Sequence, residues 1–313
     1  MAYDLKKEVS KKDRLAGGHR LCAGCGAGIT VRAVLRALDA EDKAVITNAT
    51  SCLEVSTFMY PYTAYEDSYI HSAFENAAAT TSGVEAAYKV LKRKGKVKEN
   101  FKFITFGGDG GTYDIGLQSL SGALERGHDM VYVCYDNEAY MNTGIQRSSS
   151  TPRFADATTS PAGNDLPGKI QNKKDLTLIV AAHGVPYAAQ TTLFGNMKDL
   201  HEKARKAIYT KGANFLNVLS PCPRGWGYNS EDLALMCKLA VETCVWPMYE
   251  IEDGVWRLTY EPKKKLPVEE FLSKQGRFSH MFKPGNEWTI EATQKYVDQK
   301  WDELLKRCGD SEK

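Results

Sequence analysis

The chain has 313 residues, a formal net charge of +2, and contents of 42% hydrophobic and 26% charged residues. These values are ordinary for a globular protein and give no case for a nucleic-acid partner. No apolar run reaches the roughly 18 residues that a membrane-spanning helix needs. The N-terminal segment is charged and contains no apolar signal region, so we expect a cytoplasmic protein that binds no membrane.

Cysteine usage points to metal or redox chemistry. The chain contains eight cysteines, and a protein that is not exported rarely joins its cysteines in disulfides. We therefore expect thiol ligands or a redox pair rather than a disulfide framework.

The first part of the chain is predicted to hold two helices and a strand after an N-terminal leader of residues 1–17, of which residues 1–14 are expected to be solvated. Apolar residues at helical spacing predict a helix over Gly28–Leu38, and a short apolar run predicts a strand over Ala44–Thr47. The segment Ser72–Lys94 is rich in small residues at its start and is predicted to be one long helix.

The clearest unit follows directly. Phe101–Phe106 is typical of a buried strand, Gly107–Gly111 of a tight turn, Tyr113–Arg126 of a helix and Met130–Tyr135 of the next buried strand. Apolar strands separated by a helix indicate a parallel sheet in an α/β fold.

Residues 142–172 differ in kind. They are rich in Ser, Thr, Pro and Gly, so we expect a long loop, and loops of this size are often functional. After this loop the alternation resumes with helix Asp175–His183, strand Tyr187–Gln190, helix Met197–Tyr209 and strand Phe215–Leu219.

We interpret residues 18–246 as one α/β domain and residues 247–313 as a C-terminal extension. The extension is predicted to contain a hairpin over Tyr249–Tyr260 and a final amphipathic helix over Ile290–Cys308.

A glycine-rich turn and an asparagine one strand later suggest a metal and phosphate site. Asp109 lies in the string FGGDGG, which ends a strand and opens a helix, and ligands of open α/β sheets bind at that edge. Glycines in such turns are often only conformational. Asn137, however, follows the next strand 28 positions later, so both side chains belong to one edge of the sheet. Their oxygens and the Ala139 carbonyl would suit Mg²⁺ together with a diphosphate.

The cysteines form a second constellation. Cys22 and Cys25 make a C-x-x-C pair, which alone could be a zinc knuckle, a redox pair or part of an iron–sulfur site. Zinc and a 4Fe–4S cluster each need four ligands, and Cys52 and Cys222, both in loops after strands, are the best further candidates. Spacing alone does not separate the two metals. The remaining cysteines are expected to be structural: Cys134, Cys237, Cys244 and Cys308.

The chain resembles the β subunit of the multi-subunit pyruvate:ferredoxin oxidoreductases. Its GDG string, followed one strand later by an asparagine, resembles the thiamine diphosphate-binding signature. Longer runs that match the family are GHRLCAGCGAGITV, SCLEVSTFMYPYTA, YIHSAFENAAAT, YDNEAYMNTGIQRSSSTP and SPCPRGW. The resemblance implies a parallel-sheet thiamine diphosphate-binding fold of the pyrophosphate-binding type.

The resemblance also implies ligands, position by position. One 4Fe–4S cluster would be held by Cys22, Cys25, Cys52 and Cys222, and Mg²⁺ by Asp109, Asn137 and the Ala139 carbonyl. Thiamine diphosphate would be lined by Ala27, Cys52, Gly108, Asp109, Gly110, Gly111, Asn137, Tyr140, Met141 and Asn142. Of these, Asn142 would act in catalysis, with its amide directed towards the reacting carbon.

The implied activity is oxidative decarboxylation of a 2-oxo acid, with pyruvate as the leading candidate and electrons passing through the cluster to ferredoxin. The implied partners are ferredoxin, an α-type subunit and other subunits, one of which carries further 4Fe–4S clusters. A carboxylate that activates the cofactor would come from a partner. We therefore expect Glu54 and Glu75 to be structural or interface residues, and the isolated chain to be inactive.

Two alternatives stay open from the sequence. The same chemistry could act on oxalate, giving CO₂ without coenzyme A, or on another 2-oxo acid, because this family's substrate pocket belongs largely to the partner. A non-catalytic zinc-binding α/β module is the alternative from a different class.

Overall fold

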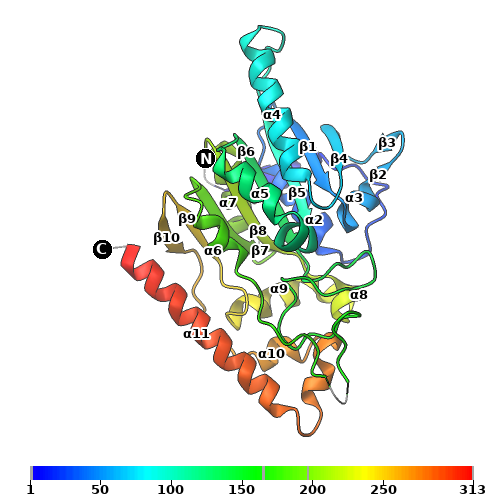
Figure 1. The fold of residues 1–313 in the computed structure, drawn as a ribbon, viewed down its shortest axis with the longest axis vertical. Helices are drawn as coiled ribbons and strands as arrows, with labels where there is room; N and C mark the ends of the chain where they lie inside the picture. Colours follow the sequence, from blue (N-terminus) through cyan, green and yellow to red (C-terminus); the bar gives the residue numbers. More distant parts are fainter. Residues whose placement is uncertain (1–2, 164–165, 196, 312–313) are drawn as a thin grey trace.

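A computed structural model describes residues 3–163, 166–195 and 197–311 (Figure 1). One eight-stranded sheet lies at its centre, in the order β10-β9-β7-β8-β6-β5-β1-β4. Six neighbouring strands run parallel, namely β7, β8, β6, β5, β1 and β4 in their order in the sheet. Strand β9 pairs antiparallel with β7 and with β10. The strands are β1 Lys43–Ala49, β4 Ser68–Ser72, β5 Phe101–Gly108, β6 Met130–Asp136, β7 Tyr187–Thr192, β8 Ala213–Leu219, β9 Tyr249–Glu252 and β10 Val255–Leu258.

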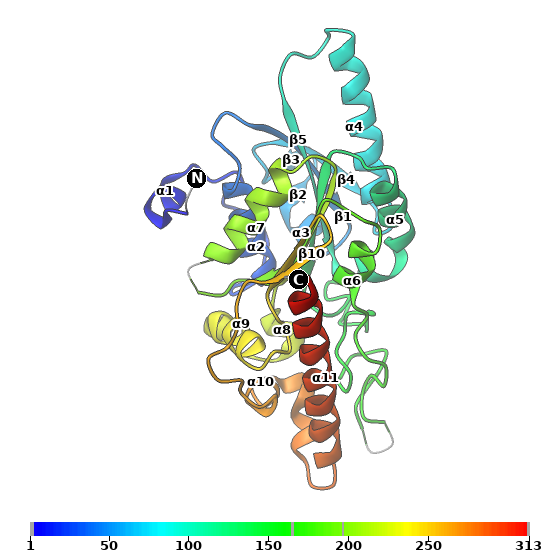
Figure 2. The same cartoon turned by 90° about the vertical axis from the view of Figure 1, so that its left-hand side faces the viewer.

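Helices cover both faces of the sheet (Figure 2). Helices α2 and α7 pack on one face through side chains such as Val31 and Leu200. Helices α4, α5 and α6 pack on the other through side chains such as Leu120 and Val180. Because both faces are covered, every residue of β6 and β8 is buried. The helices are α2 Gly26–Arg36, α4 Ala77–Arg93, α5 Leu117–Glu125, α6 Leu176–Ala181 and α7 Lys198–Tyr209.

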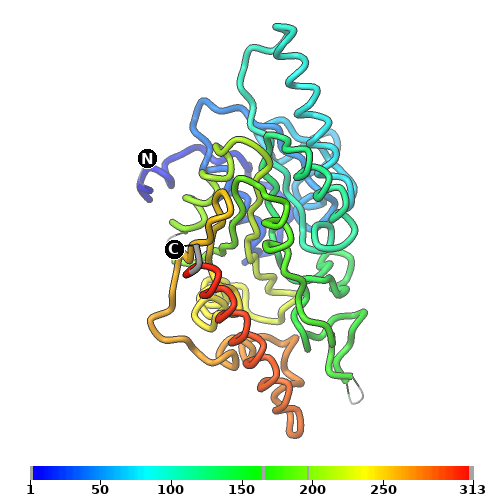
Figure 3. The backbone as a smooth tube through the Cα atoms, turned by 60° about the vertical axis from the view of Figure 1, so that its left-hand side comes forward, coloured from blue at the N-terminus to red at the C-terminus, as the bar shows by residue number. Residues whose placement is uncertain are grey.

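The C-terminal helices gather beyond the carboxyl ends of the central strands (Figure 3). They enclose a third apolar core that contains Trp226, Phe271 and Phe278. The long helix α11 starts there and returns beside β10. The elements are α8 Pro223–Trp226, α9 Leu233–Glu242, α10 Glu269–Leu272, a 3₁₀ helix Gly276–Phe282 and α11 Glu287–Ser311. No helix in the described ranges is long and apolar enough to cross a membrane.

Smaller elements complete the fold. They are α1 Leu5–Ser10, α3 Cys52–Thr57, a hairpin of β2 Phe58–Met59 and β3 Tyr62–Thr63, a π-helix Gly110–Ile115 and a 3₁₀ helix Ser230–Asp232. Between β6 and α6 the described residues form neither helix nor strand, which confirms the predicted long loop.

The predicted α/β fold with a parallel sheet is confirmed, and two local predictions are wrong. The helix predicted from Ser72 begins only at Ala77, because Ser68–Ser72 pairs with β1 as the edge strand β4. The turn predicted at Gly107–Gly111 is shorter, since β5 continues through Gly108. Residues 3–14 of the leader are exposed or half-buried, and Met1 and Ala2 lie outside the described residues.

The predicted C-terminal hairpin is present as β9 and β10, and it extends the central sheet beyond β7. The domain boundary after residue 246 stays a prediction.

Candidate cofactor site

The glycine-rich end of β5 allows close packing of an aromatic ring. A π-helix, a form frequent at functional sites, begins at Gly110. A Cβ on Gly110 would lie 2.4 Å from ring atoms of Tyr140. The Tyr140 hydroxyl donates a 2.7 Å hydrogen bond to the Gly110 carbonyl. Glycine is therefore required at this position by the neighbouring ring.

Asp109 and Asn137 face each other from the ends of neighbouring strands, β5 and β6, which pair in parallel. The side-chain amide nitrogen of Asn137 lies 2.9 Å from Oδ1 of Asp109 and 2.9 Å from the carbonyl oxygen of Ala139, and it donates a hydrogen bond to each. If the amide turned over, its oxygen would join these two oxygens around one point. Oxygen ligands of this kind fit Mg²⁺.

Asp109 is fully buried beside a second carboxylate. Burial and the charge of Asp136 raise the pKa of Asp109 well above its usual range. The hydroxyl of Ser148 donates a 2.5 Å hydrogen bond to Oδ2 of Asp109, which leaves Oδ1 directed at Asn137. A cation beside Oδ1 would favour the ionised carboxylate, so the charge balance also fits a metal ion.

A layer of paired charges lies behind Asp109. Nζ of Lys173 is 2.9 Å from Oδ2 of Asp136 and 3.0 Å from Oε1 of Glu138. Nη2 of Arg277 is 2.6 Å from Oε2 of Glu138. Burial opposes ionisation of Glu138, but the two cations outweigh it and hold its pKa below the usual value. These partners keep a buried glutamate charged and fixed in place.

A small cavity at this edge brings together all but one of the residues predicted to line the cofactor; Ala27 is the exception. Ala27 is buried in the core beneath α2. The cavity has a volume of about 20 Å³, which is room for about one water molecule. A larger ligand would therefore extend beyond this cavity. Asn142 and Thr143 line the cavity and are exposed.

The four cysteines predicted as cluster ligands lie in segments that approach one another: Cys52 begins α3, and Cys25 and Cys222 directly precede α2 and α8. The N–H of Gly26, beside the C-x-x-C pair, donates a 3.2 Å hydrogen bond to the carbonyl of Pro221, next to Cys222. Burial raises the pKa of the Cys52 thiol to about 12, and the other three thiols add to this rise. Thiols that repel one another as anions fit a cationic metal group bound through sulfur. Within the described ranges, no three Cys, His, Asp or Glu side chains are arranged to hold a metal ion.

The other cysteines are buried in the apolar cores, which agrees with the structural role predicted for them.

Glu54 is also buried, with Oε1 at 2.5 Å from Nδ1 of His71. Burial raises the pKa of Glu54, and His71 opposes the rise. Glu75 is exposed, and its backbone carbonyl accepts a hydrogen bond from Ser119.

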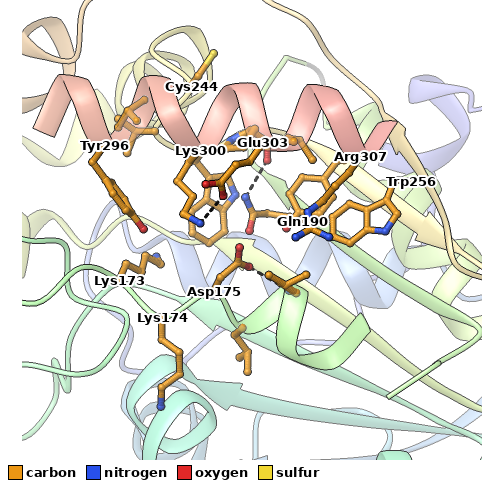
Figure 4. Close-up of a pocket in the computed structure, with 18 of the residues that line it drawn as sticks. Lys173, Lys174, Asp175, Gln190, Cys244, Trp256, Tyr296, Lys300, Glu303 and Arg307 are labelled. Carbon is orange, nitrogen blue, oxygen red and sulfur yellow. Dashed lines mark hydrogen bonds and ion pairs between the residues drawn. The ribbon is translucent and has the colours of Figure 1, made fainter. Parts of the chain in front are cut away.

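A larger cavity of about 170 Å³ lies between α11 and the sheet, lined by aromatic residues such as Trp246 and Tyr249 (Figure 4). Lys300 of α11 pairs with Glu303 at 2.7 Å, and Asp175 caps α6 by accepting from the N–H of Leu178. These groups have partners of their own. No sequence motif indicates this cavity.

Several polar residues behind the site were not predicted: Tyr113, Ser148, Ser150, Lys173 and Arg277. The hydroxyls of Tyr113 and Ser150 both donate to Asp136, at 2.7 Å and 2.6 Å. Ser148 and Ser150 belong to the long loop that was predicted to be functional. Their place in that loop is the sequence feature that could have pointed to them. Arg277 carries no sequence signal, because its partner Glu138 lies 139 positions away.

Comparisons with known proteins agree with this geometry. Residues 47–218 match the family described as thiamine pyrophosphate enzyme, C-terminal TPP binding domain. Pyruvate synthase subunit PorB of Thermotoga maritima is 55% identical, covering 96% of this chain and 94% of its own. The ketoisovalerate oxidoreductase subunit VorB of Pyrococcus furiosus is 41% identical, covering 97% and 96%.

Among solved structures, a 2-oxoglutarate:ferredoxin oxidoreductase from Magnetococcus marinus has a TM-score of 0.56 at 24% identity, covering 71% of this chain and 68% of its own. This is a likeness of fold. The family match spans more than half of the chain and contains the strands that precede Asp109 and Asn137. This chain therefore belongs to the thiamine pyrophosphate enzymes and, among them, to the family of the pyruvate synthase PorB subunits.

Proposed function

We propose that this chain is the thiamine diphosphate-binding subunit of a 2-oxo acid:ferredoxin oxidoreductase, with pyruvate as its substrate. The observation that carries the proposal is the convergence of the Asp109 carboxylate, the Asn137 side-chain amide and the Ala139 carbonyl at the carboxyl edge of the sheet. Pyruvate is favoured because the relative at 55% identity is a pyruvate synthase subunit.

The chain's own residues would bind and orient the cofactor. Asp109, Asn137 and the Ala139 carbonyl would hold Mg²⁺, which in turn binds the diphosphate. When bound, thiamine diphosphate supplies the chemistry that breaks the bond between the carboxylate and the carbonyl carbon of a 2-oxo acid. Asn142, which lines the cavity and is exposed, would contact the substrate there.

The four cysteines Cys22, Cys25, Cys52 and Cys222 would hold one 4Fe–4S cluster, whose chemistry is one-electron transfer. Support comes from their chemistry and placement: the C-x-x-C turn is hydrogen-bonded to the loop of Cys222, and Cys52 lines the cofactor cavity. Electrons released at the thiamine site would then leave towards ferredoxin.

The residues that this chain contributes to the site would need a partner subunit for catalysis. Among the described residues that line the cavity, Asp109 is the only carboxylate, and its position suits the metal. Activation of the aminopyrimidine requires a second carboxylate, which we assign to an α-type partner. The isolated chain would then bind cofactor weakly and catalyse nothing.

Substitution of Asp109 tests the cofactor assignment. Asp109→Ala should weaken Mg²⁺–thiamine diphosphate binding by about 100-fold or more, since it removes a direct ligand. Asp39→Ala, which breaks an ion pair with Arg205 elsewhere in the chain, is the control. Retained affinity in Asp109→Ala, measured by titration of the assembled enzyme, would sink the assignment.

The substrate is tested separately on the whole complex. Pyruvate, 2-oxoisovalerate, 2-oxoglutarate and oxalate are offered with and without coenzyme A, and ferredoxin reduction is followed. Pyruvate should give the highest kcat/KM and should require coenzyme A. A preference for 2-oxoisovalerate would favour the second candidate, a branched-chain enzyme, which the 41% identity to VorB supports.

A further inference from the structure

The turn that carries two of the proposed metal ligands has a strained residue at its centre. Glu138, between Asn137 and Ala139, has a backbone φ of 66°, a left-handed conformation that residues other than glycine rarely adopt. In this conformation the Asn137 amide and the Ala139 carbonyl oxygen come within 2.9 Å of each other. Whatever holds Glu138 in place therefore sets the geometry of these ligands.

Glu138 is held at its backbone and at its carboxylate. Its N–H donates to Oδ1 of Asp136 at 3.0 Å, and its carbonyl accepts from the hydroxyl of Thr151 at 2.7 Å. Its carboxylate is 2% exposed and lies between Nη2 of Arg277 at 2.6 Å and Nζ of Lys173 at 3.0 Å. Two cations from different parts of the chain thus hold one buried side chain.

Arg277 comes from the C-terminal part of the chain, within the 3₁₀ helix Gly276–Phe282. It is buried, and its guanidinium lies 3.9 Å from the ring centre of Trp226. Trp226 in turn donates from Nε1 to the carbonyl of Asn137 at 2.8 Å. Arg277 therefore pairs directly with the Glu138 carboxylate. It also packs on Trp226, which is hydrogen-bonded to the carbonyl of Asn137.

We propose that Arg277 is a positioning residue for Mg²⁺–thiamine diphosphate, acting by holding Glu138 so that Asn137 and Ala139 present their oxygens towards Asp109. This inference rests on the proposed function. A guanidinium suits the task because its planar donors pair with a carboxylate while its face stacks on an aromatic ring. Lysine at this position keeps the charge and loses the stacking.

The test measures the affinity of Mg²⁺–thiamine diphosphate for the assembled enzyme after cofactor removal. Arg277→Met should raise Kd by about 10- to 100-fold, the range seen when residues that orient metal ligands are lost. Arg277→Lys should raise Kd less. Saturating cofactor should restore most of kcat, because Arg277 contacts no reacting atom.

The matched control is Arg205→Met. Arg205 makes two contacts with Asp39, at 2.8 Å and 3.0 Å, on the α2–α7 side of the sheet. Its loss should leave Kd for the cofactor unchanged. An equal rise of Kd in both variants would mean that Arg277 acts only through general stability, and would overturn the proposal.

Glu138→Gln and the double variant Arg277→Met/Glu138→Gln test whether Arg277 acts through Glu138. If Arg277 acts through Glu138, the double variant's rise in Kd falls well short of the product of the two single rises. Multiplicative effects, or a wild-type Kd in Arg277→Met, overturn the proposal and leave the proposed function standing. If Arg277→Met does not fold, the rises in Kd of Arg277→Lys, of Glu138→Gln and of their double variant are compared in the same way. A wild-type enzyme that binds no thiamine diphosphate would instead contradict the proposed function itself.

Discussion

Ser148 lies 39 positions after Asp109 in the chain, yet its hydroxyl donates a 2.5 Å hydrogen bond to Oδ2 of Asp109. The Ser148 oxygen is itself held by the N–H groups of Ser150 and Thr151, at 3.1 Å and 3.2 Å. One carboxylate oxygen of Asp109 therefore accepts from Ser148, and the other, Oδ1, accepts a 3.3 Å hydrogen bond from the backbone N–H of Asn137. The long loop after β6 thus orients the side chain that we propose as a metal ligand.

Removal of this hydroxyl should weaken the site without abolishing it. We expect Ser148→Ala to raise the Kd for Mg²⁺–thiamine diphosphate by about 10-fold, because one hydrogen bond to a charged group is worth roughly 1.5–3 kcal/mol and part of that is recovered by rearrangement. Ser121→Ala, which removes a 2.8 Å hydrogen bond to His183 elsewhere, is the control. An unchanged Kd in Ser148→Ala would show that the loop does not orient Asp109.

A methyl group at Gly110 should displace the Tyr140 ring, because the added Cβ would lie 2.4 Å from it. We expect Gly110→Ala to destabilise the protein by about 1–3 kcal/mol, as overpacking does, and to impair cofactor binding. Gly83→Ala is the matched control: Gly83 lies within α4, and nothing lies within 4 Å of its added Cβ. This change should stabilise the protein by about 0.5–1 kcal/mol. Thermal unfolding and cofactor titration of both variants would check these outcomes.

The approach of Asp109 to Asn137 could be predicted because it depends on local order in the sequence. A strand, a helix and a strand separate Asp109 from Asn137, and parallel pairing of β5 with β6 then brings the two residues to one edge. The C-x-x-C pair was visible for the same reason. Cys52 and Cys222 were predicted as further ligands because each follows a strand, and that assignment stays a prediction.

The supporting charges could not be predicted, because no local pattern encodes a partner far along the chain. Arg277 follows α10, next to the third core. Its contact with Glu138 forms only when that core packs against the carboxyl ends of the strands. The edge strand β4 was missed for a related reason. Its burial does not alternate cleanly, so its conformation is decided by pairing with β1 rather than by its own sequence.

Loss of one proposed cluster ligand should be visible in the colour of the protein. Anaerobically purified Cys222→Ser is expected to lose most of its iron and sulfide and its broad visible absorbance, because a serine oxygen is a poor substitute for a thiolate. Cys237→Ala, a change in a buried core cysteine, should keep its iron. A colourless wild-type protein that holds one zinc would instead support the zinc-binding alternative.

Acid should destabilise the α4 face of the sheet through Glu85. The carboxylate of Glu85 accepts from Nδ1 of His128 at 2.9 Å and from the N–H of Asp129 at 3.2 Å, and it pairs with Lys89 at 2.5 Å. Burial opposes its ionisation, but these partners outweigh burial and hold the pKa of Glu85 below its usual value. A lowered folded-state pKa means that the unfolded chain binds the proton more readily.

The stability contributed by Glu85 is therefore fully present above the pKa of the unfolded state, about 4.3, and is lost as the pH falls through the lower pKa of the folded state. Glu85→Gln should remove this part of the acid sensitivity, so the melting temperature should fall less steeply below about pH 4.5 than in the wild type. At neutral pH the variant should be less stable, because Lys89 and His128 lose a charged partner. Melting curves between pH 3 and pH 7 that run parallel in the two proteins would contradict this account of Glu85.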